Sequence, residues 1–289
     1  MKIGFIGLGS MGAPIARRLA RCGFSVTGCD VSAQALAAFD EPGTSRERDP
    51  IATAQAVDVL GVCVRTDAQL EELCIEDTIF SALGEGGIFI LNSTVAPELA
   101  RRLAGRAGKY GVSLIDVGVS GGGPAAIEGR LSLFVGGDDR AVERARPFLD
   151  AIGKVAHLGP VGRGLEGKLL NNLVSIANYG MAAAILDLGV AMEFDREQLR
   201  QALMNGSAQG YALQAVPGLL GWRGGATPAS LADMHDLLAK DVIHAATLAP
   251  SEDTAMAALQ ASCGAMLARI KRAAAEAVEE ESIPEPENA

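Results

Sequence analysis

The chain has few of the side chains on which metal, disulfide and nucleic-acid chemistry depend. Its three histidines, His157, His235 and His244, have no cysteine or carboxylate at metal-ligand spacing, so a metal site is not expected. The five cysteines are scattered and include no Cys-x-x-Cys pair, which indicates reduced thiols and not a disulfide framework. Acidic residues outnumber basic ones and the net charge is -10, whereas nucleic-acid binding requires clustered Lys and Arg. The sequence therefore predicts neither a metal nor a nucleic-acid partner.

Uninterrupted hydrophobic runs are scarce as well. The apolar run at residues 2–6 is broken by glycines too early for a signal-peptide core, so we expect a cytoplasmic protein. Residues 173–192 are the membrane candidate, but they include Asn178 and Asp187, which the centre of a bilayer would penalise. A helix buried between domains or subunits is the better interpretation, and no membrane partner is expected.

Short apolar runs do alternate with helical patterns over the first 160 residues. This alternation is typical of a parallel sheet with helices on both faces. It predicts an α/β domain of the Rossmann type over residues 1–160, with a doubly wound, mostly parallel sheet. Strands are expected at residues 2–6, 25–29, 59–64, 88–91, 113–116 and 132–135, with a helix at 13–21.

The pattern changes after Gly159-Pro160 to long segments rich in Ala and Leu, which predict an all-α domain over residues 161–275. Helices are expected at residues 165–192, 195–205, 231–249 and 254–277. A loop between the second and third is punctuated by Pro217, Gly218, Gly221, Gly224, Gly225 and Pro228. Residues 276–289 hold six glutamates and two prolines, so they are expected to form a disordered acidic tail.

A glycine-rich motif directly follows the first expected strand and opens the first expected helix. It reads Gly7-Leu8-Gly9-Ser10-Met11-Gly12, and such a tight turn at a helix N-terminus suits a pyrophosphate. Asp30 lies 18 residues past Gly12, at the end of the second expected strand. A carboxylate there accepts the ribose hydroxyls of NAD and repels the 2′-phosphate of NADP, so NAD is the expected cofactor.

A second glycine-rich turn and a lysine supply the candidate chemistry. Ser120-Gly121-Gly122-Gly123 leaves backbone N–H groups open and can bind a carboxylate. Lys168 stands near the start of a long apolar helix with almost no other charge, where burial and the helix N-terminus favour a lowered lysine pKa. Asn171 and Asn172 follow three and four residues on, so they share the helical face of Lys168.

Taken together, these motifs resemble the β-hydroxyacid dehydrogenase family of the 3-hydroxyisobutyrate dehydrogenase type, which is related to 6-phosphogluconate dehydrogenase. The matching blocks are Gly7 to Gly12, Ser93-Thr94-Val95-x-Pro97, Ser120-Gly121-Gly122 with Ala126-x-x-Gly129, Gly162-x-Gly164-x-x-x-Lys168-x-x-Asn171-Asn172, and the shorter Lys240-Asp241. The resemblance implies an NAD-dependent oxidoreductase that transfers a hydride between the cofactor and a small β-hydroxy acid or its semialdehyde. It also implies a homodimer or homotetramer, in which residues 161–275 serve substrate binding and oligomerisation.

The resemblance further assigns a role to each matching position. Lys168 would exchange the proton of the β-hydroxyl as general acid and base. The substrate would be held by Ser120, Gly121, Gly122, Asn171 and Asn172. The cofactor would be held by Gly7, Leu8, Gly9, Ser10, Met11, Gly12, Asp30, Val64, Arg65, Thr94 and Lys240.

The chain departs from the family pattern at three internal places, and its acidic tail replaces the family's usual C-terminal sequence. Leu91 stands two residues before Ser93-Thr94, where family members commonly have an aspartate. In the segment before Ser120, family members usually have a proline, and this chain has Gly118-Val119. Arg65 also replaces a usual proline, and it could engage an extra acidic group of the substrate. An unchanged KM for every accepted acid in Arg65→Leu would contradict that hypothesis. These departures leave the identity of the substrate open.

Two other classes of function remain as alternatives. One is a glyoxylate, semialdehyde or imine reductase on the same scaffold, although imine reductases generally lack a catalytic lysine and Lys168 argues against that version. The other is a catalytically inactive nucleotide-binding protein, which the joint presence of Ser120, Lys168 and Asn172 disfavours.

Overall fold

The computed structural model describes the chain except for residues 56, 223–225, 250–252 and 282–289. It divides into two units, Met1–Lys168 and Leu169–Ala289. The first unit therefore reaches beyond residue 160, the boundary expected from the sequence. The physical reason is that the first residues of helix α9 (Arg163–Ala191) are hydrogen-bonded to the sheet, as described below.

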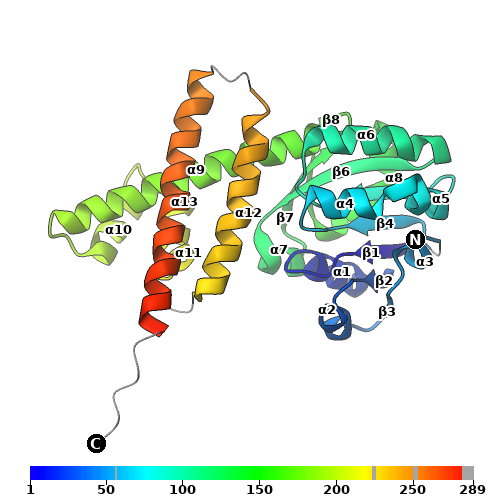
Figure 1. Ribbon diagram of the computed structural model, residues 1–289, viewed down its shortest axis with the longest axis horizontal. Coiled ribbons are helices and arrows are strands. Elements are labelled where there is room, and N and C mark those ends of the chain that lie inside the picture. Colours follow the sequence, from blue (N-terminus) through cyan, green and yellow to red (C-terminus); the bar gives the residue numbers. More distant parts are fainter. Residues whose placement is uncertain (56, 223–225, 250–252, 282–289) are drawn as a thin grey trace, which may run out of the picture. The chain divides into compact units, whose positions relative to one another are not determined.

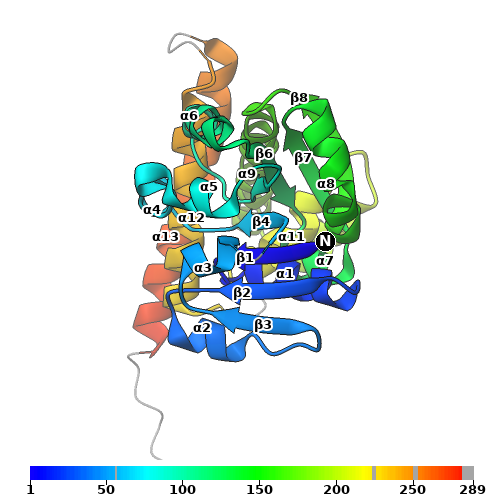
Figure 2. The same cartoon turned by 90° about the vertical axis from the view of Figure 1, so that its right-hand side faces the viewer.

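Over the described residues, the first unit holds an eight-stranded sheet in the order β3-β2-β1-β4-β5-β6-β7-β8 (Figure 2). Neighbouring strands run parallel except for β6 and β7, which are antiparallel. The strands are β1 (Lys2–Ile6), β2 (Ser25–Cys29), β3 (Thr44–Glu47), β4 (Val59–Val62), β5 (Ile88–Leu91), β6 (Ser113–Ser120), β7 (Leu131–Gly136) and β8 (Gly153–Gly159). The predicted Rossmann-type fold with a mostly parallel sheet is confirmed.

Helices cover the sheet on its two faces (Figure 1). They are α1 (Gly12–Arg21), α2 (Ala33–Ala38), α3 (Pro50–Gln55), α4 (Asp67–Leu73), α5 (Thr78–Leu83), α6 (Pro97–Ala107), α7 (Gly122–Glu128) and α8 (Asp139–Ile152), with 3₁₀ turns at Ile75–Asp77 and Gly108–Tyr110. Strand β5 shows how alternating side chains divide the interior into two cores. Ile88 and Ile90 join the core that includes helices α1 and α8, whereas Phe89 and Leu91 join the core that includes α5 and α6.

Strands β3 and β8 are edge elements that the sequence did not predict. Thr44–Glu47 consists of polar residues and is half-buried to exposed, so its sequence has no apolar alternation. Gly153–Gly159 alternates between half-buried and exposed residues and pairs with β7 at the other edge of the sheet. Both strands are stabilised by backbone pairing with a neighbour, and periodicity in a single segment does not show such pairing.

The second unit consists of helices over its described residues. After α9 come α10 (Arg196–Met204), α11 (Tyr211–Leu219), α12 (Pro228–Ala246) and α13 (Thr254–Glu281), and α12 packs against α13 (Figure 1). Their core includes Leu173, Ile176, Val216, Met266 and Ile270. The predicted helical C-terminal region is confirmed.

Two details of the second unit differ from the sequence-based expectations. Tyr211–Leu219 is a helix that contains Pro217, where a loop was expected, because Leu213 and Val216 are buried in the core. Pro228 occupies the first turn of α12, a position that tolerates proline. Helix α13 continues to Glu281, into the segment expected to be a disordered tail, whereas residues 282–289, Gly224 and Gly225 lie outside the described residues.

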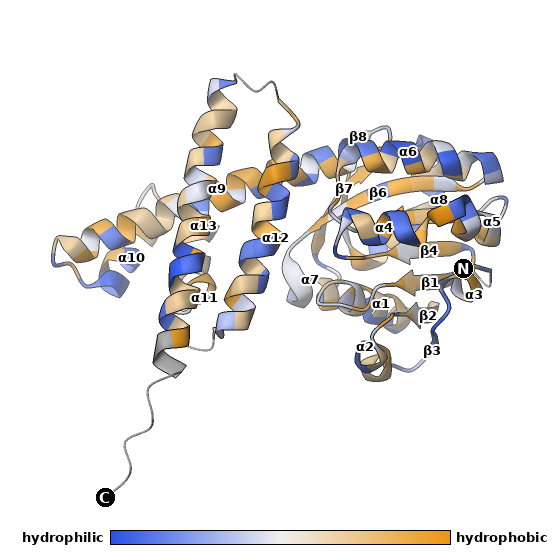
Figure 3. Cartoon of the chain, in the orientation of Figure 1, coloured by the Kyte–Doolittle hydropathy of each residue, from blue (hydrophilic) through white to orange (hydrophobic). Residues whose placement is uncertain are grey.

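Helix α9 is long and apolar enough to cross a membrane, with a mean hydropathy of 1.6 over its most apolar window. Of that window, 44% is buried inside the protein. Figure 3 shows pale to orange colours, the apolar end of the scale, over most of α9 beyond its first turns. Core helices of globular proteins pass the same test, so this helix by itself is weak support for a membrane span.

Candidate active site

The turn between β1 and α1 has glycines where the backbone leaves no room for a side chain. Gly7 has a φ of 91°, and a Cβ there would lie 2.2 Å from the carbonyl oxygen of Cys63. A Cβ on Gly12 would lie 1.8 Å from the carbonyl oxygen of Gly7. At Gly9, by contrast, none of the described atoms lies within 4 Å of the Cβ position. The backbone is therefore closely packed at Gly7 and Gly12, and the position of Gly9 is open, as close approach of a pyrophosphate requires.

Helix α1 directs its first N–H groups toward this turn. Met11 occupies the N-cap position, and in the described part of the chain no side chain caps the helix and no acid lies in its first turn. The positive end of the helix dipole is thus available to an anion. Together with the open glycine turn, this helix start fits the phosphates of a dinucleotide.

Asp30 follows β2 and joins two segments of the predicted cofactor site. Its Oδ2 accepts a hydrogen bond of 2.6 Å from the N–H of Leu8, and its Oδ1 accepts one of 2.7 Å from the N–H of Ser32. Ser32 in turn caps helix α2, accepting a hydrogen bond from Ala35. The carboxylate predicted from spacing therefore holds the glycine turn against the end of β2.

Further acids lie near this end of the sheet. The pKa of the Cys29 thiol is raised, first by burial and also by the negative charges of Asp30, Glu47 and Asp49, while a hydrogen bond with Thr53 lowers it. Glu47 ends β3, which pairs with β2. Three carboxylates therefore act electrostatically on one position at the carboxyl end of β2.

The loops after β4 and β5 meet at the same edge of the sheet. Ser93, which is 2% exposed, accepts a hydrogen bond of 2.8 Å on its Oγ from the N–H of Val64. Arg65 is exposed, and its N–H donates to the side chain of Gln69 in the first turn of α4. Ser93 thus links Val64 and Arg65 to the segment that includes Thr94, as expected for residues at the carboxyl ends of adjacent parallel strands.

The Ser120 turn lies beside the nucleotide turn. Gly121 and Gly122 have φ angles of 131° and 74°, which favour glycine. A Cβ on Gly123 would lie 3.4 Å from the carbonyl oxygen of Ser10, and helices α7 and α1 pack together. The structure therefore brings the predicted carboxylate-binding turn next to the predicted pyrophosphate-binding turn.

The start of helix α9 is fixed by a buried aspartate of β6. Asp116 is 0% exposed and accepts hydrogen bonds from the N–H groups of Gly162, at 2.7 Å, and Leu165, at 2.8 Å. Burial raises its pKa to about 6, while those two backbone donors act to lower it. Sequence reasoning did not identify Asp116, although a single charge within an apolar strand was a usable signal for a buried, hydrogen-bonded carboxylate.

An ion-pair network on α9 also ties this helix start to the first unit. Glu166 accepts hydrogen bonds from Arg101 of α6 and from Arg163, the latter at 2.7 Å. Burial raises the pKa of Glu166, but the bonds from Arg163 and Arg101 outweigh it and leave the pKa lowered.

Lys168 lies in the second turn of α9 and is half-buried. Its Cβ lies only 2.4 Å from the position that a Cβ on Gly118 would take, so the lysine stem packs directly on the backbone of β6. Gly118 is two residues before Ser120 on the same strand. Lys168 therefore packs on the same strand, β6, that leads into the Ser120 turn.

A polar cluster in the second unit contains the remaining predicted residues. Asn171 Nδ2 donates to Asn172 Oδ1 at 3.1 Å, and Asn172 Nδ2 donates to Asp241 Oδ2 at 2.6 Å. Lys240 Nζ lies 3.8 Å from Asp241 Oδ1. Asp241 is 4% exposed and was seen in the sequence only as the neighbour of Lys240, so its role as hydrogen-bond acceptor for Asn172 comes from the tertiary structure.

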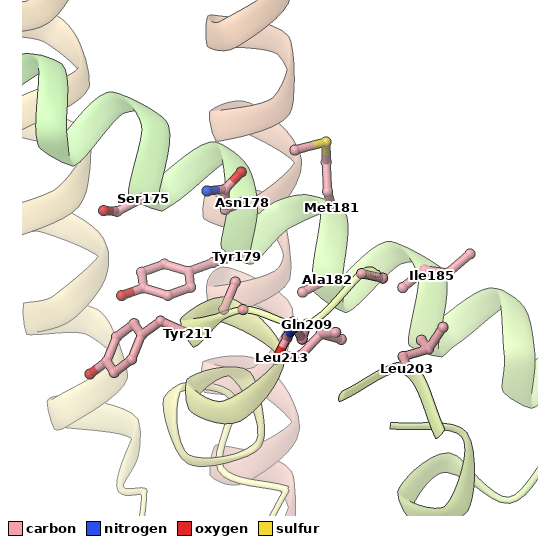
Figure 4. Close-up of a pocket in the computed structure, with 13 residues that line it drawn as sticks. Ser175, Asn178, Tyr179, Met181, Ala182, Ile185, Leu203, Gln209, Tyr211 and Leu213 are labelled. Carbon is pink, nitrogen blue, oxygen red and sulfur yellow. The ribbon is translucent and has the colours of Figure 1, made fainter. Parts of the chain in front are cut away.

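The second unit also contains a cavity of about 430 Å³ (Figure 4). In it the rings of Tyr179 and Tyr211 lie with their centroids 6.4 Å apart, near Ser175 of α9. The predicted catalytic and binding residues are not among those that line it. Among the residues that the structure describes, no group of three or more His, Cys, Asp or Glu side chains could hold a metal ion.

Comparisons with known proteins agree with this arrangement. A family model described as the NAD binding domain of 6-phosphogluconate dehydrogenase matches residues 2–161. The NAD-dependent L-serine dehydrogenase of Pseudomonas aeruginosa is 32% identical over 83% of this chain and 83% of that protein. The 3-hydroxyisobutyrate dehydrogenase of the same organism is 33% identical over 73% of this chain and 72% of that protein.

A solved structure of the 3-hydroxyisobutyrate dehydrogenase of Mycobacterium tuberculosis with L-serine has the same fold, with a TM-score of 0.77 and 24% identity. The similarity covers 98% of this chain and 99% of that chain. The glycine turn with Asp30, the Ser120 turn and the family matches lead to one assignment. The chain belongs to the β-hydroxyacid dehydrogenase family of NAD(P)-binding oxidoreductases that act on hydroxy acids.

Proposed function

We propose that the protein is an NAD-dependent dehydrogenase or reductase of a small β-hydroxy acid or its semialdehyde. The supporting observation is the convergence on β6 and its neighbours: the Ser120 turn beside Ser10, and Lys168 against Gly118. Bound NAD would supply a hydride acceptor, and the residues of this chain would hold the substrate and move its proton.

Substrate binding and proton exchange are assigned to different groups. The backbone of the Ser120-Gly121-Gly122 turn would hold the carboxylate. Lys168 would take the proton from the β-hydroxyl during oxidation and return it during reduction. Lys168 is half-buried in the second turn of α9, where its stem packs on Gly118 of β6.

The substrate class follows from the shared chemistry of the relatives. L-Serine and 3-hydroxyisobutyrate each have a carboxylate, and each has a hydroxyl on the carbon β to it. These are the two groups that the proposed residues would recognise. Asn171 and Asn172, one helical turn beyond Lys168 on α9, would orient the substrate. Lys240, beside Asp241, would contact the cofactor.

NAD is proposed over NADP because of the charge at the end of β2. A 2′-phosphate would approach the side of the ribose at which Asp30 is expected, and Glu47 and Asp49 add negative charge there. The repulsion between these carboxylates and a phosphate favours the cofactor that lacks it.

The proposal is tested by measuring NADH formation with a panel of β-hydroxy acids and with both cofactors. We expect turnover with at least one small acid, a clear preference for NAD, and loss of nearly all turnover in Lys168→Ala with unchanged NAD affinity. Lys168→Arg is the matched control, since it keeps the charge but cannot act as a base at neutral pH. Largely intact turnover in Lys168→Ala would remove the lysine from the mechanism, and an inactive parent chain that still binds NAD would support the nucleotide-binding alternative.

We further propose that the chain forms a homodimer or homotetramer through an exposed apolar face of α9. Its large members are about half exposed: Leu170 at 54%, Val174 at 48%, Met181 at 54%, Ile185 at 45% and Leu188 at 54%. Beyond Lys168, Asp187 is the single charged residue of α9, and it forms ion pairs with Arg196 and Arg269. A net charge of -10 opposes an anionic membrane surface, so a second copy is the favoured occupant. The cytoplasmic location expected from the sequence stays a prediction, which cell fractionation would check.

A further inference from the structure

We propose that Asp67 is a positioning residue that fixes the edge of the cofactor site at which the nicotinamide lies. The inference rests on the proposed function, because it concerns the reactive end of the bound cofactor. It follows from three features of the first unit: the order of the strands, two hydrogen bonds that join the loops after β4 and β5, and the place of the Asp67 carboxylate at the start of two helices.

The order of the strands determines where a nicotinamide must lie. The proposed pyrophosphate turn follows β1 and the Ser120 turn ends β6, and β4 and β5 lie between those two strands. A hydride passes directly between the nicotinamide and the substrate, so the ring must lie between the two turns. The loops at the carboxyl ends of β4 and β5, which include Arg65 and Thr94, therefore lie against the ring.

Two hydrogen bonds fix the loop after β5 at both of its ends. At its start, Ser93 Oγ accepts a hydrogen bond of 2.8 Å from the N–H of Val64. At its end, Asp67 Oδ2 accepts one of 3.1 Å from the N–H of Ala96. Thr94 lies between these two points and is half-buried. Its position relative to the loop after β4 is therefore set by Ser93 on one side and by Asp67 on the other.

Asp67 is itself held at a fixed point, because the loop that precedes it is closed by hydrogen bonds. It is the first residue of α4, whose start is a capping box formed by Thr66 and Gln69. Gln69 Oε1 accepts the N–H of Arg65 at 2.9 Å, and Thr66 Oγ1 accepts the N–H of Gln69 at 3.2 Å. Leu70 is 0% exposed and anchors α4 in the core that includes α6. A fixed helix start thus carries the carboxylate that holds Ala96.

The carboxylate lies at the start of two helices at once. It belongs to the first turn of α4, and its partner Ala96 is the N-cap residue of α6, where Pro97 follows. Alanine has no side-chain oxygen with which to satisfy N–H groups at a helix start, so an acceptor must come from another element. A negative charge is also favourable at the N-terminal end of either helix. Asp67 therefore joins α4 to α6 at the cofactor edge of the sheet.

Loss of this hydrogen bond would release the nicotinamide edge and leave the adenosine end in place. The adenosine end is held by other contacts, since Asp30 accepts hydrogen bonds from Leu8 and Ser32 at the end of β2. A shift of Thr94 would displace the ring, and a misplacement of about 1 Å costs on the order of a hundredfold in rate. The two ends of the cofactor should therefore respond differently to a change at Asp67.

The experiment measures the two ends of the cofactor separately. Binding of NADH is followed by the fluorescence of its nicotinamide ring, and binding of ADP-ribose, which lacks that ring, is followed by calorimetry. In Asp67→Ala we expect weaker binding of NADH, an unchanged dissociation constant for ADP-ribose, and a kcat lower by about a hundredfold. Glu71→Ala is the matched control, because Glu71 is also an acid of α4 and bonds to Arg102 of α6 at 2.8 Å. It should match the parent in all three measurements.

Two further variants separate the hydrogen bond from the charge. Asp67→Asn keeps an oxygen acceptor and should retain the NADH affinity and the kcat of the parent. Ala96→Pro removes the N–H, and the φ of -59° at Ala96 suits proline, so this variant should reproduce Asp67→Ala with no change of charge. Asp67→Ala combined with Ala96→Pro should bind NADH no more weakly than the weaker single variant, because both changes remove the same bond.

An Asp67→Ala protein with the NADH affinity and the kcat of the parent overturns the proposal, and so does an Asp67→Asn protein as weak as Asp67→Ala. Equal losses of NADH and ADP-ribose binding would also overturn it, because they would show a general disturbance of the site. If Asp67→Ala does not fold, Ala96→Pro decides by the same measurements. The proposed function fails separately if the parent chain turns over none of the β-hydroxy acids, a result that is obtained before any variant is compared.

Discussion

The carboxyl group of Asp116 is removed from water inside the first unit, where a charge is unfavourable. Burial raises its pKa to about 6, although the N–H groups of Gly162 and Leu165 favour the charged form. An unperturbed aspartate titrates at 3.8, so the folded protein binds this proton more tightly than the unfolded chain. The stabilisation that results is fully present below the unfolded pKa and is lost as the pH rises through about 6. Above that pH, the ionised carboxylate is held in place by its two backbone donors.

This linkage predicts a pH-dependent difference between the parent protein and Asp116→Asn. The amide does not titrate, so the free energy of unfolding of the parent should fall relative to the variant by roughly 2 kcal/mol between pH 4 and 7. The variant is also less stable by a constant amount, because one of two backbone donors loses its acceptor. Urea unfolding at several pH values measures both effects. A difference that did not change with pH would contradict the raised pKa.

At the scale of elements, the glycine inside helix α6 and the glycine that ends α5 have opposite effects on stability. Gly105 lies inside α6 on an exposed turn, where glycine only adds conformational freedom to the unfolded chain. Gly84 ends α5 with a φ of 73° and a ψ of 179°, a conformation that is nearly restricted to glycine. Both Cβ positions are free of described atoms within 4 Å, so backbone conformation alone separates the two sites.

Alanine substitutions should therefore change stability in opposite directions. We expect Gly105→Ala to raise the free energy of unfolding by about 0.5–1 kcal/mol. Gly84→Ala should lower it by about 1–3 kcal/mol, because alanine must adopt a strained backbone conformation. Denaturant unfolding of the two variants at neutral pH gives both values. Equal effects of the same sign would show that local conformation does not govern these sites.

At the scale of the whole molecule, the proposed oligomer depends on the exposed apolar face of α9. Leu170, Val174, Met181, Ile185 and Leu188 follow one another at intervals of three, four or seven residues, the spacing of a single helical stripe. Such a stripe without charge is unfavourable in water and typical of a surface that packs against another helix. Met181 and Ile185 also line the cavity of the second unit, so the stripe is continuous with a hollow that a partner side chain can fill.

A charge placed on this stripe should separate the copies. We expect the parent chain to sediment as a dimer or tetramer and Ile185→Lys to sediment as a monomer, because an ammonium would be buried without a partner in the interface. Ile75→Lys is the matched control, since Ile75 is also an exposed isoleucine, at 62%, and belongs to the first unit and not to α9. A monomeric parent chain would remove the proposed interface. Flotation of the parent with anionic vesicles would instead identify α9 as a membrane-binding surface.

The two glycine-rich turns could be recognised in the sequence because their shape depends on local backbone geometry. The turn from Gly7 to Gly12 and the Ser120 turn need glycines at fixed spacing, and that spacing is visible in one segment of chain. The parallel sheet was predictable for a related reason, since strands such as β4 and β5 are buried on both faces and therefore apolar throughout. The roles of Lys168 and Asn172 remain predictions drawn from the family resemblance.

By itself, the sequence determined the α/β class of the first unit, the helical nature of the second, the glycine turn after the first strand and the family, because each depends on periodicity or on short motifs. Only the tertiary structure decided what joins distant segments: Asp30 bonded to Leu8, Asp116 bonded to the start of α9, and Gly118 packed against Lys168. It also decided that Thr44–Glu47 is a strand and that Pro217 lies within a helix. Such features depend on which neighbour buries a side chain or pairs with a backbone, and that neighbour is set by the fold and not by the adjacent residues.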